Sequence, residues 1–150
     1  METTSPLFVK YCKEVQKQRE KRKKTFNSHQ IEKSIRSFDS SALQLQDCAL
    51  TYQNFSPLVA VFRRNAHLVE NVVSADFSEN KCFGDRAIKK LANMFEATPN
   101  LKSLNIANTG IENVGFVLLE CVRSLPGLVS LDLSRLQFQC SLITSFLLVS

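Results

Sequence analysis

The 150 residues, 44% hydrophobic and 22% charged with four Gly and four Pro, have the composition of one ordinary globular domain. This composition excludes collagenous and disordered chains. The net charge of +5 arises in the N-terminal segment, because residues 1–38 carry ten Lys and Arg against four Asp and Glu, while residues 39–150 carry nine against ten. We therefore expect a basic helical leader or linker over residues 1–38 and a nearly neutral domain over residues 39–150.

The cysteines and the hydropathy of the chain indicate a compartment. The five cysteines are odd in number, widely spaced and contain no C-x-x-C, so they predict neither a disulfide framework nor a zinc site and favour a reducing compartment. No apolar run approaches the roughly 20 residues that cross a bilayer, and no secretory signal is present. We expect a soluble intracellular protein without metal, cofactor or membrane contact.

The leader begins with an amphipathic stretch around Leu7, Tyr11 and Val15, and then residues 16–24 are charged all round, which predicts a solvated helix or linker. Its last residues form the basic run Lys21, Arg22, Lys23 and Lys24. This run has two interpretations: a nuclear-localisation signal or phosphate-contacting patch, or a solvated helix face. No aromatic residue interleaves with the run, so any direct nucleic-acid contact is expected to be weak and confined to the leader.

A sequence repeat occupies the rest of the chain. The segment starting at Leu101 has apolar residues at repeat positions one, four, six and eleven: Leu101, Leu104, Ile106 and Ile111. Matching copies start 29 residues earlier at Val72 and 27 residues later at Leu128, where the last copy is incomplete; a weaker copy starts near residue 40. This is the pattern of the leucine-rich repeat in its long helical variant. It predicts an α/β leucine-rich-repeat solenoid with a parallel sheet on its concave face.

Each repeat predicts one strand followed by one helix. The strands are expected near residues 43–46, 73–77, 102–106 and 129–133, although two starting points remain open between residues 68 and 77. The first helix is expected to start at Ser56 and Pro57, since Pro favours the first helical position. In the third helix, 3.6-residue spacing places Val114, Leu118, Leu119 and Val122 on the inner face.

Position nine of each repeat predicts a turn. The chain leaves the strand there, and its backbone groups need polar partners. Asn80, Thr109 and Cys48 occupy this position in successive copies. We expect their side chains to form hydrogen bonds across the turn to the neighbouring coil.

The strand positions that face away from the helices form the candidate site. They include a polar column at position five, Asp76–Asn105–Asp132, and the flanking residues Ser74, Ser78, Lys102, Ser103, Ser130 and Ser134. Such a rigid concave array typically binds protein partners in solenoids. The alternative is that these are merely solvated strand residues.

Catalytic motifs are missing. The histidines are His29 and His67, and the chain contains no H-E-x-x-H, G-x-S-x-G or phosphate-binding glycine loop. We interpret the cysteines as buried structural thiols. The alternative, a hydrolase that uses a cysteine as its nucleophile, would need a histidine near a thiol. The sequence therefore predicts a protein-interaction scaffold and not an enzyme.

Several segments carry a family resemblance. The repeats resemble those of the ribonuclease-inhibitor type. The segments A-L-Q-L-Q-D-C-A-L-T, P-L-V-A-V-F-R-R-N-A-H-L-V-E and S-E-N-K-C-F-G-D-R-A-I-K-K-L-A further resemble the C-terminal leucine-rich region of Tonsoku-like proteins, over about residues 6–134. This resemblance implies a nuclear scaffold of replication-fork repair and genome maintenance that binds protein partners on chromatin. The family's histone-binding repeats lie upstream of this region, so no histone-binding residue is carried over.

The alternative is a cytosolic leucine-rich-repeat regulator with an actin-linked or signalling partner. The sequence after Leu133 starts a fourth helix but supplies no polar capping repeat, although an exposed solenoid end normally needs one. Its apolar residues, among them Leu142, Ile143, Phe146 and Leu147, would be left uncovered. We therefore expect a fragment of a longer horseshoe.

Overall fold

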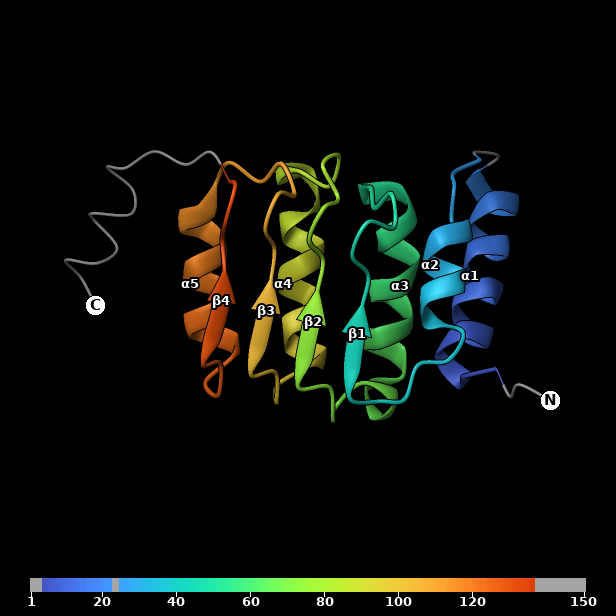
Figure 1. The fold of residues 1–150 in the computed structure, drawn as a ribbon. Helices are drawn as coiled ribbons and strands as arrows, with labels where there is room; N and C mark the ends of the chain where they lie inside the picture. The colour runs from blue at the N-terminus through green and yellow to red at the C-terminus, as the bar shows by residue number, and fades with distance from the viewer. Residues whose placement is uncertain (1–3, 23–24, 137–150) are drawn as a thin grey trace.

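The computed structural model describes residues 4–22 and 25–136 and has the architecture of a short leucine-rich-repeat-like solenoid, as the repeat pattern predicts (Figure 1). Four parallel strands form one sheet in chain order and alternate with helices. The elements are α1 (Pro6–Arg22), α2 (His29–Ile35), β1 (Ala42–Gln44), α3 (Tyr52–Arg64), β2 (Ser74–Asp76), α4 (Ile88–Ala97), β3 (Ser103–Asn105), α5 (Val114–Ser124) and β4 (Ser130–Asp132). Short 3-10 turns at Ala66–Leu68 and Asp85–Ala87 follow α3 and precede α4. In the described part of the chain, no helix is long and apolar enough to cross a membrane.

The strand register confirms the repeat alignment. Ala75 lies opposite Leu104, and Leu104 lies opposite Leu131, so position four of each copy points to the same side of the sheet. The weaker first copy joins the sheet through β1, with Leu43 opposite Ala75. Each strand has only three residues, fewer than the pattern predicts. The pairing of Ala75 with Leu104 aligns Val72 with Leu101, which settles the open start of the second copy in favour of the register with Val72 at position one.

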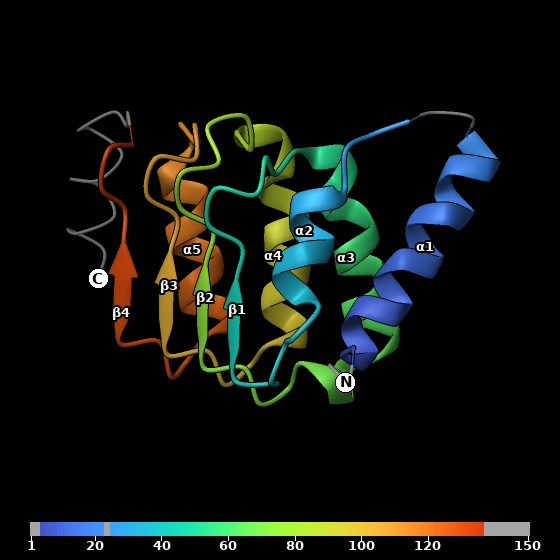
Figure 2. The same ribbon diagram turned by 45° about the vertical axis from the view of Figure 1, so that its right-hand side comes forward.

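The core lies between the sheet and the row of helices α3, α4 and α5, which cover one face of the sheet (Figure 2). The strand and the helix of a single repeat cannot bury their apolar sides without neighbouring repeats, so the repeats share one continuous core. Three aromatic rings join the first two repeats. Phe55 of α3 meets the edges of Phe77 and Phe83 at centroid distances of 5.6 and 5.1 Å, and all three side chains are buried.

Asn80 ties the first two coils together. Its Oδ1 accepts hydrogen bonds from the backbone N–H groups of Cys48 and Leu50, at 2.9 and 3.0 Å. Its Nδ2 donates to the carbonyl oxygens of Leu45 and Phe77, at 2.8 and 2.6 Å. The side chain therefore satisfies groups on both coils, as position nine predicts. Thr109, in contrast, donates to Ile106 within its own turn.

The segment predicted as a leader packs on the first repeat. Leu7, Tyr11 and Val15 of α1 are buried, and α1 lies against α3 (Figure 2). The Tyr11 hydroxyl donates a hydrogen bond to the Asn54 carbonyl at 2.8 Å, and Glu14 pairs with Arg64 at 2.8 Å. The two N-terminal helices thus extend the core of the solenoid. The last turns of α1 are largely exposed, as their charge predicts.

Two helix predictions are wrong. Helix α3 starts at Tyr52 and not at Ser56, because Thr51 and Asn54 form a capping box in which each side chain accepts the other's backbone N–H. Pro57 therefore lies inside the helix.

The inner face of α5 also differs from the prediction. Val114, Val117 and Cys121 are its buried residues, whereas Leu119 and Val122 are 55% and 68% exposed. The consecutive apolar residues of this segment fit more than one helical face, so spacing alone does not select one. The predicted fourth helix after Leu133 lies outside the described residues.

Replacing Asn80 by Ala should destabilise the protein by about 2–6 kcal/mol, since two buried N–H groups would lose their acceptor at about 1–3 kcal/mol each. Urea unfolding measures this change. Asn71→Ala is the matched control, because Asn71 is exposed. Equal midpoints for the two variants would contradict the role assigned to Asn80.

Candidate partner-binding surface

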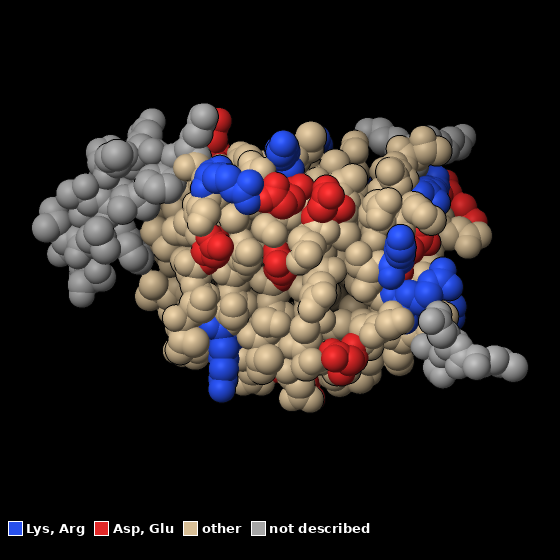
Figure 3. All heavy atoms as spheres, viewed as in Figure 1, with Lys and Arg blue, Asp and Glu red and all other residues tan. Residues whose placement is uncertain are grey.

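The face of the sheet that the helices leave uncovered is the candidate site. This open sheet face consists of side chains at positions three and five of the repeats, which lie side by side in the strand register: Gln44, Ser74, Asp76, Ser103, Asn105, Ser130 and Asp132. All are exposed or half-buried. Most of this side of the molecule is uncharged, with scattered acidic and basic groups (Figure 3). A shallow depression of about 270 Å³ runs across β1, β2 and β3.

The polar column at position five is built as predicted, and it begins one repeat earlier than predicted, at Gln44. Asp76 lies opposite both Gln44 and Asn105, and Asn105 lies opposite Asp132. A column of four such groups across adjacent strands about 4.8 Å apart spans roughly 15 Å. The sheet therefore presents a row of carboxylate and amide groups at a fixed spacing.

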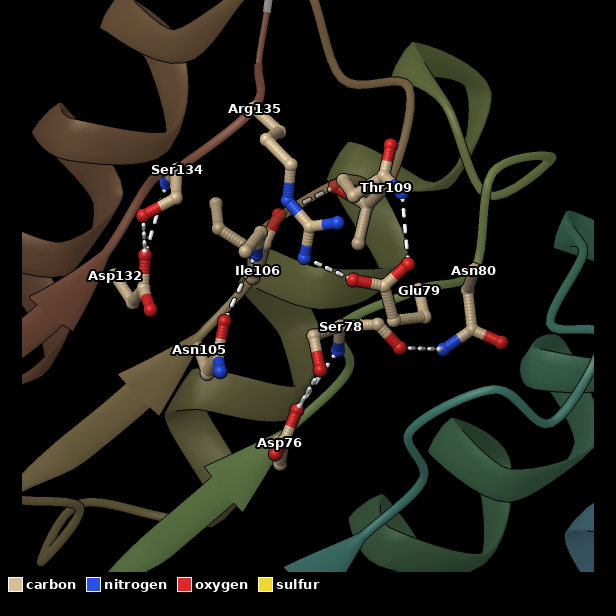
Figure 4. A network of polar contacts seen from close by, with 12 residues as sticks. Asp76, Ser78, Glu79, Asn80, Asn105, Ile106, Thr109, Asp132, Ser134 and Arg135 are labelled. Carbon is tan, nitrogen blue, oxygen red and sulfur yellow. Dashed lines mark hydrogen bonds and ion pairs between the residues drawn. The ribbon is translucent and has the colours of Figure 1, made fainter.

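The same side chains also shape the turns that follow the strands. Oδ1 of Asp76 accepts hydrogen bonds from the backbone N–H and the hydroxyl of Ser78, at 2.9 and 2.6 Å. Asp132 repeats both bonds with Ser134 (Figure 4). These bonds from Ser134 lower the pKa of Asp132 below its usual value. One oxygen of each carboxylate thus serves the turn, and the other accepts no hydrogen bond from residues 4–22 and 25–136.

A second row of residues, at position eight, lies beside the column. Asp47, Glu79, Asn108 and Arg135 all have positive φ, between 48° and 63°. The left-handed backbone turns the chain out of each strand at the same place. Because this geometry recurs at one repeat position, the side chains of the four residues leave the chain at equivalent points.

Three members of the position-eight row form a polar network across the last three described repeats. Glu79 accepts a hydrogen bond from Asn108 at 2.8 Å and pairs with Arg135 (Figure 4). The hydrogen bond from Asn108 and the contact with Arg135 lower the pKa of Glu79. The network was not predicted from the sequence. Their common repeat position is the signal that could have revealed it.

The remaining predicted residues lie in different settings. Ser78 is buried against Asp76, while Ser134 and Lys102 are exposed. Lys21 and Arg22 are exposed at the end of α1. Lys23 and Lys24 lie outside the described residues. The structure therefore brings the position-three and position-five residues together on the open sheet face and places Lys21 and Arg22 away from it.

Three thiols, those of Cys12, Cys48 and Cys121, sit in settings that oppose their ionisation. Burial raises the pKa of Cys121 to about 12, and burial together with a hydrogen bond to Glu32 raises that of Cys12 to about 11. The Cys48 thiol is buried and contacts the Ser34 hydroxyl at 3.0 Å. Since the thiolate is the reactive form, these three residues are poor nucleophiles. No group of metal-ligating side chains occurs in residues 4–22 and 25–136.

Neither the known protein-family models nor the curated proteins match this chain. The alternation of strands and helices around a four-stranded parallel sheet is compatible with leucine-rich repeats. The fold and the open sheet face are therefore the observations from which a function is argued.

Replacing Glu79 by Gln should make the protein less sensitive to acid. A carboxylate whose pKa is lowered on folding stabilises the fold at pH values above its usual pKa of 4.5. This contribution is lost as the pH falls through the lowered pKa. The melting temperature of the variant should therefore fall less between pH 5 and pH 3, measured by circular dichroism. Glu112→Gln, at an exposed glutamate, is the control. Parallel curves for the wild type and Glu79→Gln would contradict the network.

Proposed function

We propose that this chain is a protein-interaction module, without catalytic activity, that binds a protein partner through the open sheet face. The alignment of positions three and five across four strands supports this proposal most directly. Three serines, Ser74, Ser103 and Ser130, lie opposite one another in the register. They run parallel to the column of Asp76, Asn105 and Asp132.

The chemistry of this face favours a protein as the ligand. Hydroxyl, amide and carboxylate groups complement the backbone amides and the Lys or Arg side chains of a partner. They stand on short strands that the shared core holds rigid, so binding costs little conformational entropy. The depression on the face is shallow, which suits a protein surface better than an enclosed small molecule.

A more specific role follows from the sequence resemblance. We infer that the partner belongs to the nuclear machinery of replication-fork repair, as for the Tonsoku-like leucine-rich region. The segments quoted above support this inference, together with the exposed basic residues Lys21 and Arg22 at the end of α1. The alternative remains a cytosolic regulator with an actin-linked or signalling partner.

Placing arginines at Ser74, Ser103 and Ser130 together should block the open sheet face without disturbing the turns. The side chains of these serines make no hydrogen bond within the described residues, unlike those of Asp76 and Asp132. The amount of each partner captured from nuclear and cytosolic extracts should be at least tenfold lower for this triple variant than for the wild type, measured by quantitative mass spectrometry.

A matched control adds the same charge elsewhere: Ala66→Arg, Asn71→Arg and Leu119→Arg, at three exposed positions that are not on the open sheet face. The control should keep its partners. Equal capture by both triple variants would show that the face is not the binding site.

The two cellular roles differ in where the protein accumulates. Replacing Lys21, Arg22, Lys23 and Lys24 by Ala should reduce nuclear accumulation of a fluorescent fusion by several-fold if the basic run acts as a localisation signal. Replacing Lys10, Lys13, Lys17 and Arg36 by Ala gives a control with equal loss of charge. A wild-type protein that stays in the cytosol would favour the regulator.

A further inference from the structure

A hollow of about 490 Å³ lies where the end of α1 meets the start of α3, and no residue of the open sheet face lines it. The last turn of α1 and the first turn of α3 lie at the same end of the molecule (Figure 2). The residues that line the hollow include Arg22 from the predicted basic run and Arg86 from the turn before α4. Residues far apart in the sequence thus build one basic site.

The hollow is positively charged. Its lining contains two arginines and no acidic residue, and neither Arg22 nor Arg86 forms an ion pair within the described residues. Lys90 adds a third cation, with its Nζ 5.9 Å from the centre of the Tyr52 ring that lines the hollow. Cations gathered without acidic partners attract an anionic ligand.

Aromatic rings accompany these cations. The Tyr52 ring carries the Arg86 guanidinium 4.6 Å from its centre. Phe26 also lines the hollow, and Arg19 of α1 stands 5.2 Å over its ring. In sequence, the basic run has no interleaved aromatic residue, but in the folded protein Tyr52 and Phe26 line the same hollow as Arg22. The objection to base stacking therefore does not apply to the folded protein.

The neutral lining residues supply hydrogen-bonding groups. These are Gln18, Thr25, Gln53 and Ser56. Their amide and hydroxyl groups can donate to phosphate oxygens and can also accept from base edges. The hollow thus combines cations, aromatic rings and neutral hydrogen-bonding groups.

We propose that this hollow binds single-stranded nucleic acid, with Arg22 and Arg86 on backbone phosphates and the rings of Tyr52 and Phe26 beside the bases. The combination of a basic groove and aromatic rings is the common chemistry of single-strand binding. A phosphopeptide is the weaker fit, since a single phosphate would use only part of this set of arginines, lysine and rings. The site is separate from the open sheet face, so the chain can hold a strand and a protein partner at once.

Fluorescence anisotropy with a labelled 15-nucleotide oligo(dT) tests the proposal. The double variant Arg22→Ala/Arg86→Ala should bind at least tenfold more weakly than the wild type. The slope of log K against log salt should fall by about 1.4, because each lost phosphate contact lowers it by about 0.7 for single strands. Arg63→Ala/Arg123→Ala removes two exposed arginines elsewhere and should change the slope and affinity little.

A second variant separates stacking from charge. Tyr52→Leu should weaken oligo(dT) binding about fivefold or more while leaving the salt slope unchanged. Both sets of variants should keep the wild-type melting temperature within a few degrees.

Three results would overturn the proposal. They are no salt-dependent binding of oligo(dT) by the wild type, equal affinity of the two double-arginine variants, and tighter binding of a phosphoserine peptide or a 15-base-pair duplex than of the single strand.

Discussion

The side chain of Asn80 is the contact on which the stacking of the first two coils depends. Its amide bonds to backbone groups on both coils in a place that water does not reach. Because each strand has only three residues, the sheet leaves most of the backbone N–H and C=O groups of the turn that follows it unpaired. A buried polar side chain can bond to these groups without breaking the apolar core. The position of Asn80 therefore holds β1 beside β2 and aligns the columns of the open sheet face.

The fold divides its polar residues between structure and recognition. Asn80 is fully committed to the backbone, while Asp76 and Asp132 each use one oxygen to shape a turn. The side chains of the serines at position three make no such bond with the part of the chain that the structure describes. The candidate function therefore depends most on side chains that the fold itself does not need.

Repetition explains which features could be predicted. A fixed period placed Ala75, Leu104 and Leu131 in one column, and the same arithmetic predicted the role of Asn80 correctly. The period cannot predict contacts outside it. The amphipathic start of the leader indicated an apolar side at Tyr11, but the contacts of Tyr11 with Asn54 and of Glu14 with Arg64 join segments of unrelated pattern, so the surface on which the leader packs could not be predicted.

The errors have two different causes. The start of α3 was missed because Pro57 is a strong but ambiguous signal, whereas the capping box at Thr51 and Asn54 determines the actual start. The hollow at Arg22 was missed for a different reason. Tyr52 and Arg86 come from parts of the chain distant from Arg22, and they meet it only through the packing of α1 on α3.

The central claim is that Asn80 joins the first coil to the rest of the solenoid as one cooperative unit. Hydrogen exchange of the Cys48 and Leu50 amides measures this most directly, since both donate to Asn80. We predict that they open with the same free energy as the Phe77 amide, which bonds to Asn105 in the next coil. Exchange at Cys48 and Leu50 that is orders of magnitude faster than at Phe77 would contradict the account.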